Sequence, residues 1–197
     1  SGEYVMSDFE TPDVAKQRAL VRAKQNAQEK AGVFVNSYTQ VKNLQLADEE
    51  IIVIASGIMS VTETVYEHES TADGFLYRAK IKADIDTDEI NKWLEKGVQE
   101  RSAMAAQNKE LQAAVAEQNK EIAKLKKQLA EQNSTAARDR LKKEFANADN
   151  AFLSNQKIEE GNKLYWNGDY LGAIARYTEA TELNNRNGIA YRNRGTA

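Results

Sequence analysis

The side chains that could do chemistry in this chain are carboxylates and hydroxyls, with almost no thiol or imidazole groups. There is no cysteine and one histidine, His68, in 197 residues. This composition excludes cysteine nucleophiles, disulfides, zinc fingers and clusters of histidine ligands. His68 stands between Glu67 and Glu69, and a histidine beside a carboxylate can act as a general base. A serine partner is missing, because Ser56 lies in an Ala-Ser-Gly sequence and not in a nucleophile elbow. We therefore expect an ordinary strand histidine.

A second group of residues has the carboxylate spacing of a calcium-binding loop. Its members are Asp84, Asp86, Asp88 and Glu95. Glu89 stands where an EF-hand loop requires glycine, which argues against a calcium site. We expect instead the solvated end of a strand followed by a helix N-cap. The sequence predicts no catalytic residue, no metal and no cofactor, and an enzyme built from carboxylates and hydroxyls is the weaker alternative.

Composition limits the partners that this chain could bind. Hydrophobic residues make up 41% of the chain and charged residues 29%, with a net charge of −3. A general nucleic-acid binder would carry a basic excess, so we expect no nucleic-acid partner. No apolar run approaches the roughly 20 residues that span a bilayer, so we expect no membrane contact. What remains is a protein that acts through interactions.

Residues 1–95 have the pattern of a small α/β domain. Thr11 and Pro12 start a helix whose alanines recur at every fourth position until Gly32, which is typical of a helix stop. Asp73-Gly74 indicates a hairpin turn between two alternating segments. We expect strands over 3–8, 33–41, 61–69 and 75–85 and helices over 11–32 and 49–56. The predicted order is β-α-β-α-β-β, an α+β domain with the helices on one face of a small, mainly antiparallel sheet.

This first domain resembles a known bacterial family. The opening Glu3-Tyr4-Val5-Met6, the alanine-ridged helix, the Gly57-Ile58-Met59 step and the final hairpin look like the small secreted lipoprotein domains related to the N-terminal domain of flagellar assembly protein T. The resemblance covers about half of the chain. It implies a location in the bacterial cell envelope or secretion, with a cytoplasmic location as the alternative, and it implies no catalytic residues.

Residues 96–135 are predicted to form a long helix with a coiled-coil seam. Apolar and polar residues step by alternating fours and threes, as in a heptad repeat. The seam consists of Asn108, Leu111, Val115, Ile122, Leu125 and Leu129. Branched residues at a and leucines at d favour a parallel homodimer. The alternative is a fold-back onto the connecting helix at 136–153, where Leu141, Phe145, Ala148 and Phe152 form a second stripe.

Residues 154–197 contain the most specific pattern in the chain. Gly195 follows Gly161 by 34 residues, and small residues recur at Ala173 and Ala180. Together with Leu164 and Tyr177, this period resembles the tetratricopeptide repeat. The resemblance implies an all-α helix pair followed by the first helix of the next repeat. A single repeat cannot bury its own face, so we expect further repeats beyond Ala197.

Tetratricopeptide arrays bind peptides or proteins along the surface that their first helices line. Asn162 and Asn193 stand where clamp asparagines occur in chaperone-adaptor arrays, and Tyr165 is a further groove candidate. Ile158 occupies the place of the first clamp lysine, so generic groove residues or structural polar residues are the favoured interpretation.

The sequence as a whole predicts a non-enzymatic bacterial scaffold. Its repeats would recruit a protein or peptide partner, and its helical rod would provide spacing or self-association. The alternative is that the N-terminal domain binds a small ligand or an envelope component, with the rod and the repeats positioning it.

Overall fold

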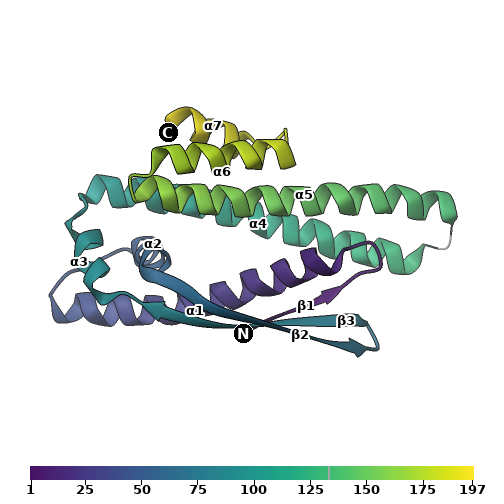
Figure 1. The fold of residues 1–197 in the computed structure, drawn as a ribbon, viewed down its shortest axis with the longest axis horizontal. Coiled ribbons are helices and arrows are strands. Elements are labelled where there is room, and N and C mark those ends of the chain that lie inside the picture. Colours follow the sequence, from purple (N-terminus) through teal and green to yellow (C-terminus); the bar gives the residue numbers. More distant parts are fainter. Residues whose placement is uncertain (133) are drawn as a thin grey trace. The chain divides into compact units, whose positions relative to one another are not determined.

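The structure is a computed structural model that describes residues 1–132 and 134–197. The described residues form a three-stranded sheet and seven helices, broadly an α+β protein (Figure 1). They divide into two compact units, Ser1–Gln107 and Asn108–Ala197. The predicted long helix at 96–135 includes residue 133, which lies outside the described residues.

Unit 1 contains an antiparallel sheet of three strands in the order β1-β3-β2. The strands are β1 (Gly2–Met6), β2 (Met59–Thr71) and β3 (Gly74–Ile85). β3 lies in the centre and pairs with both neighbours, with a bulge between Val61 and Glu63 of β2. Gly74 closes the predicted hairpin with a φ of 121°, which a residue with a side chain rarely adopts.

Helix α1 (Pro12–Val41) lies across one face of this sheet (Figure 1). Thr11 is its N-cap, as predicted, and accepts a hydrogen bond from the Val14 N–H. Small side chains on its buried face let the helix approach the sheet closely. They pack with aromatic residues of two strands in a cluster of Tyr4, Ala15, Ala19, Ala23, Tyr77 and Ala79.

The predicted strand at 33–41 is wrong, because α1 continues through Gly32 to Val41. The buried positions Ala31, Gly32, Val35 and Thr39 follow helical spacing. Gly32 packs against α2 (Asp48–Ile58), where Ile51 Cγ2 would lie 3.6 Å from an added Cβ. Packing on a second helix therefore overrides the stop signal that a glycine gives locally. The order in unit 1 is β-α-α-β-β, followed by helices.

Helix α2 ends at Ile58, one residue after Gly57, so the predicted helix at 49–56 is confirmed to within two residues at each end. At Gly57 a Cβ would stand 2.3 Å from the Trp93 ring. The missing side chain makes room for α3 (Thr87–Glu95), whose Ile90 and Trp93 are buried. Asp86 is the N-cap of α3 and accepts hydrogen bonds from two backbone N–H groups of its first turn. The acidic run at 84–88 thus contains a strand end and a helix cap.

Helix α4 (Val98–Glu131) begins in unit 1 and continues into unit 2. In unit 2 it runs antiparallel to α5 (Thr135–Trp166), and the two helices lie side by side (Figure 1). Leu111 packs with Ile158 at one end of this pair, and Arg138 donates to the Gln132 carbonyl at the other. This is the folded-back arrangement, the second of the two alternatives.

The predicted connecting helix at 136–153 and the first repeat helix are parts of the single helix α5. Its predicted stripe of Leu141, Phe145, Ala148 and Phe152 is buried. Two shorter helices follow, α6 (Tyr170–Leu183) and α7 (Gly188–Thr196). α6 packs against both α5 and α7.

Across the described residues, none of the helices combines the length and the apolar character that crossing a bilayer requires.

Enlarging a small side chain between α1 and the sheet should weaken unit 1. Ala19 is fully buried, so Ala19→Leu should lower the free energy of unfolding by about 1–3 kcal/mol through overpacking. Urea unfolding followed by Trp93 fluorescence, in a Trp166→Phe background, reports on this unit. The matched control is Gln25→Leu at an exposed position of α1, which should change stability by less than about 0.5 kcal/mol. Equal effects of the two leucines would contradict close packing.

Candidate protein-interaction site

The crossing of α5 and α6 depends on a glycine and a tyrosine. An added Cβ at Gly161 would stand 2.5 Å from the Tyr177 ring, so only a glycine leaves room for that ring. Tyr177 is fully buried, and so are Ala173 and Ala180 on the same helix. The structure therefore brings together four of the residues to which the sequence assigned a structural role in a repeat.

The two candidate clamp asparagines meet in the interior of unit 2. Asn162 and Asn193 are 1% and 2% exposed. The Asn162 Oδ1 accepts hydrogen bonds from the Tyr177 hydroxyl at 2.8 Å and from the Asn193 Nδ2 at 3.0 Å. Burial raises the pKa of Tyr177, which keeps its hydroxyl protonated and able to donate. Asn162 and Asn193 therefore link α5, α6 and α7 through buried hydrogen bonds. Neither side chain is exposed at the surface.

A second polar group, which the sequence did not suggest, fixes the start of α7. Asn187 is the N-cap of α7, and its Nδ2 also donates to Ser154 Oγ at 3.0 Å and to Asn155 Oδ1 at 2.9 Å. The Ser154 hydroxyl in turn donates to the Ala180 carbonyl at 2.8 Å. An asparagine directly before the first helical residue is the signal that could have identified the cap.

A segment of α4 lies on the face that α5 and α7 form. Leu111 is buried in one cluster with Ile158, Tyr177 and Ala190. Beside it, Arg192 donates two hydrogen bonds to the Glu110 carboxylate, at 2.9 and 2.6 Å. The hydrogen bond from Arg192 holds the pKa of Glu110 below its ordinary value. A carboxylate followed by a leucine is therefore a pattern that this face accepts.

The remaining predicted repeat residues have different environments. Leu164 and Tyr165 are partly buried beside the same cluster, and the Tyr165 ring contacts Tyr170 edge-on at 5.3 Å. A Cβ added at Gly195 would meet no atom of the described residues within 4 Å, unlike one added at Gly161.

The predicted coiled-coil seam is largely buried within one chain. Leu111, Ile122, Leu125 and Leu129 are at most 7% exposed. Asn108 and Val115 are half-buried. Leu111 packs in one cluster with Ile158 of α5, so this part of the seam is already used within the chain. The parallel homodimer stays a prediction.

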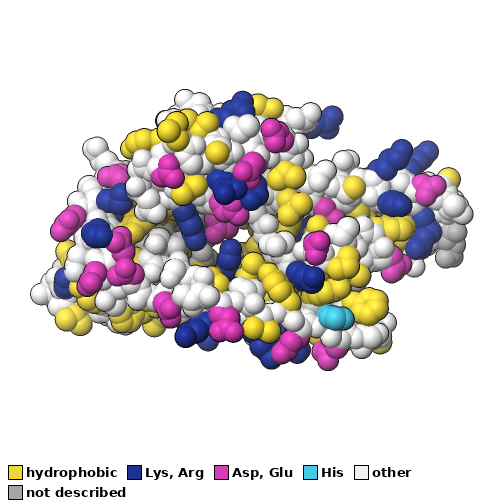
Figure 2. Space-filling view, viewed as in Figure 1, with side chains coloured by type: hydrophobic (Ala, Val, Ile, Leu, Met, Phe, Trp, Pro, Cys, Tyr) yellow, Lys and Arg dark blue, Asp and Glu magenta, His cyan; other side chains and the backbone are white. Residues whose placement is uncertain are grey.

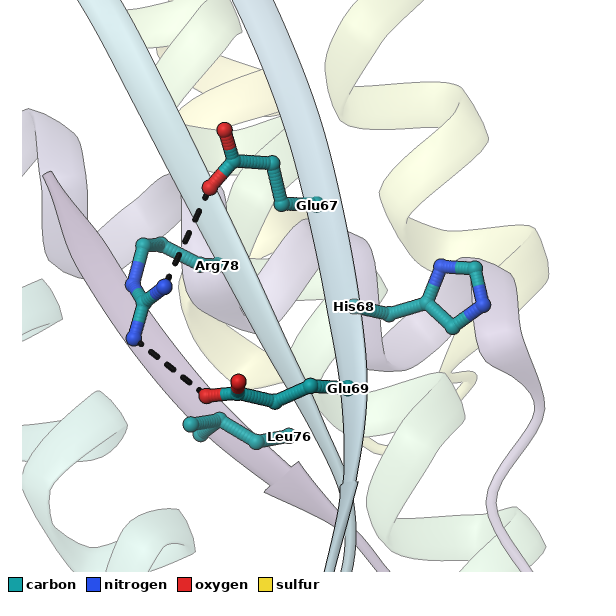
Figure 3. A pocket seen from close by; sticks show the side chains of 5 residues that line it. All are labelled: Glu67, His68, Glu69, Leu76 and Arg78. Carbon is teal, nitrogen blue, oxygen red and sulfur yellow. Dashed lines mark ion pairs between the residues drawn. The ribbon is translucent and has the colours of Figure 1, made fainter.

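In unit 1, His68 lies on β2 and its ring stacks on Tyr77, with ring centroids 5.6 Å apart. Figure 3 shows the side chains of Glu67 and Glu69 turned toward Arg78 and the side chain of His68 turned away from Arg78. Among the described residues no group of three or more acidic or histidine side chains is arranged to hold a metal ion. On the face drawn in Figure 2, basic and acidic side chains are interspersed.

A groove of about 250 Å³ lies between α1 and the sheet. Its lining is mainly apolar and includes Ala27, Met59, Ile81 and Ile85, together with the charged side chain of Lys30.

Comparison with protein-family models, with curated proteins and with solved structures gives no match in any of the three. The geometry described above is therefore the basis for the functional argument.

A methyl group at the α5–α6 crossing should destabilise unit 2. Gly161→Ala forces a Cβ against the Tyr177 ring, and the expected loss is about 1–3 kcal/mol. Gly195→Ala, in open space on α7, should be neutral or stabilising by up to about 1 kcal/mol. Trp166 fluorescence during urea unfolding, in a Trp93→Phe background, measures both. If Gly161→Ala were as stable as Gly195→Ala, the close crossing would be refuted.

The Glu110–Arg192 pair should contribute stability that depends on pH. The pKa of Glu110 is lower in the folded state, so this contribution is present at neutral pH and is lost as pH falls through that lowered pKa. Both side chains are about half exposed, so a double-mutant cycle with Glu110→Gln and Arg192→Gln should give about 0.2–1 kcal/mol at pH 7. A cycle on the exposed pair Glu117 and Lys120 is the control. A coupling energy that stays constant down to pH 2 would argue against the ion pair.

Proposed function

We propose that this chain is a non-enzymatic adaptor that holds a protein partner against the face formed by α5 and α7. We further propose that α5, α6 and α7 are related to a tetratricopeptide repeat and the first helix of the next. The close packing of Gly161 against the Tyr177 ring supports this relation, because the repeat has a glycine in its first helix and an aromatic residue four positions after an alanine, here Ala173, in its second. The 34-residue step from Gly161 to Gly195 supports it as well.

The single observation that carries the proposal is the packing of Glu110 and Leu111 of α4 against α5 and α7. A helical segment packs its leucine into the cluster around Ile158 and gives its carboxylate to Arg192. A partner helix with an acidic residue next to a leucine would find the same two complements, an apolar patch and a guanidinium. In this proposal α4 holds the site within the chain, and a partner competes for Arg192 or extends the contact along α7.

The N-terminal domain offers the runner-up function, binding of a small ligand or an envelope component. The mainly apolar groove between α1 and the sheet, which Lys30 also lines, is the observation in its favour. Its volume of about 250 Å³ is below the usual range for ligand pockets, roughly 300–1,000 Å³, so the adaptor remains the better-supported function. A location in the bacterial envelope is part of the proposal and rests on the resemblance of the N-terminal domain.

The partner should contact α7 and compete with Glu110. A photo-crosslinking residue at Tyr191, which is 44% exposed, should yield an adduct of one defined mass in the native host. The same residue at Gln128, exposed on α4, should not. Glu110→Gln should raise the yield at Tyr191 by freeing Arg192, whereas Glu117→Gln should leave it unchanged. Adducts of the same mass at Tyr191 and Gln128, or a yield that Glu110→Gln does not alter, would reject a partner at this face.

A further inference from the structure

Strand β2 forms one edge of the sheet and is unusually long for an open edge. It spans Met59–Thr71, and among the described residues it pairs with β3 alone. After its bulge it stays in register with β3 from Glu63 to Thr71. Edge strands are commonly protected by proline, lysine or further bulges, and this stretch contains no proline and no lysine. Its outer row of backbone groups is therefore a template for another strand.

The backbone groups that point outward can be assigned from two hydroxyl contacts. Thr62 Oγ1 donates to the Lys82 carbonyl and Thr71 Oγ1 donates to the Gly74 carbonyl, so these even-numbered carbonyls of β3 face β2. In an antiparallel pair every second residue bonds to its neighbour and the residues between them face away. On this alternation the residues of β2 with outward N–H and C=O groups are Thr64, Tyr66, His68 and Ser70.

The side chains next to this edge are acidic on one face of the sheet. Glu63, Glu67 and Glu69 alternate along β2 on the face away from α1, opposite Lys82, Arg78 and Leu76 of β3. Figure 3 shows Glu67 and Glu69 reaching back toward Arg78. Arg78 Nη1 lies 3.8 Å from Glu67 Oε2, and Arg78 Nη2 lies 3.6 Å from Glu69 Oε1. Lys80 also binds Glu67, and this hydrogen bond holds the pKa of Glu67 below its ordinary value. The carboxylates of Glu63, Glu67 and Glu69 all lie on β2, next to the position that an added strand would occupy.

These charges decide which strand the edge can accept. In a pair formed by two copies of β2, every antiparallel register that overlaps these residues places Glu63, Glu67 or Glu69 opposite or diagonal to a carboxylate of the other copy. Like charges at such positions are destabilising, whereas opposite charges stabilise a strand pair. Val65 is 45% exposed and Tyr66 37%, so an added strand would also cover apolar surface on both faces.

We propose that the outer edge of β2 binds an extended basic segment of a partner protein as a fourth, antiparallel strand. Its backbone bonds to the outward groups of Thr64, Tyr66, His68 and Ser70. Its lysine or arginine side chains, at every second residue, lie beside Glu67 and Glu69, and an apolar residue covers Val65. This inference rests on unit 1 alone and is independent of the proposed adaptor function of unit 2.

The test is an NMR titration of the full chain with a capped peptide of sequence Lys-Thr-Lys-Thr-Val-Thr-Lys. In the antiparallel register this peptide places lysines beside the glutamates and its valine beside Val65. We expect the amide signals of Thr64, Tyr66, His68 and Ser70 to shift and their hydrogen exchange to slow. The amides of Glu67 and Glu69, already bonded to β3, should change less. The same peptide with glutamate in place of lysine should not bind.

Two variants separate strand addition from general attraction of a basic peptide. Glu67→Gln combined with Glu69→Gln should weaken binding about fivefold, since two cross-strand charge pairs contribute about 1 kcal/mol together. Glu3→Gln is the control, because Glu3 also binds Arg78 but lies on β1 at the opposite edge. The NMR spectrum of each variant reports whether it is folded. The inference is overturned if the four outward amides gain no protection, if the acidic peptide binds equally well, or if Glu3→Gln weakens binding as much as the double variant.

Discussion

Close approach between elements, which small side chains permit, is the constraint on which both units depend. In unit 1 the alanines of α1 let the helix lie against Tyr4 and Tyr77 of the sheet. In unit 2 the absence of a side chain at Gly161 admits the Tyr177 ring between two helices. Each case pairs a small or absent side chain with a large ring, and dense packing of this kind is sensitive to a single added carbon.

Buried polar groups in unit 2 fix the relative positions of its packed helices through hydrogen bonds. Hydrophobic contact would allow α5, α6 and α7 to slide past one another, whereas hydrogen bonds accept few relative positions. Asn162 joins Tyr177 and Asn193 in one buried network, and Asn187 joins the start of α7 to α5. Removing one partner would leave a buried polar group unsatisfied, which costs about 1–3 kcal/mol. These asparagines therefore serve first to fix the geometry of the face on which Glu110 and Leu111 lie.

The two proposed interaction surfaces use different physics. The face of α5 and α7 offers side chains, an apolar patch with one guanidinium, and it is already in contact with a segment of α4. The edge of β2 offers backbone groups, and its selectivity comes from the carboxylates beside them. A chain that carries both could join two partners of different chemistry, an acidic helix and a basic extended segment.

The amino-acid sequence determined the features that depend on local preference. The Thr11 cap, the hairpin at Gly74, the alternation along β2 and β3 and the heptad seam of α4 each depend on residues near one another in the chain. Tertiary structure decided the features in which local signals were ambiguous or opposed. Gly32 indicates a helix end, yet α1 continues to Val41 because Ile51 of α2 packs against it. The seam of α4 has a pattern that could pack against a second chain or against another helix of the same chain. Leu111 packs with Ile158 of α5, the helix that follows α4 directly in the sequence. Asn162 and Asn193 carry the same amide whether they face a ligand or each other, and only the crossing of three helices, which buries both, decides between the two.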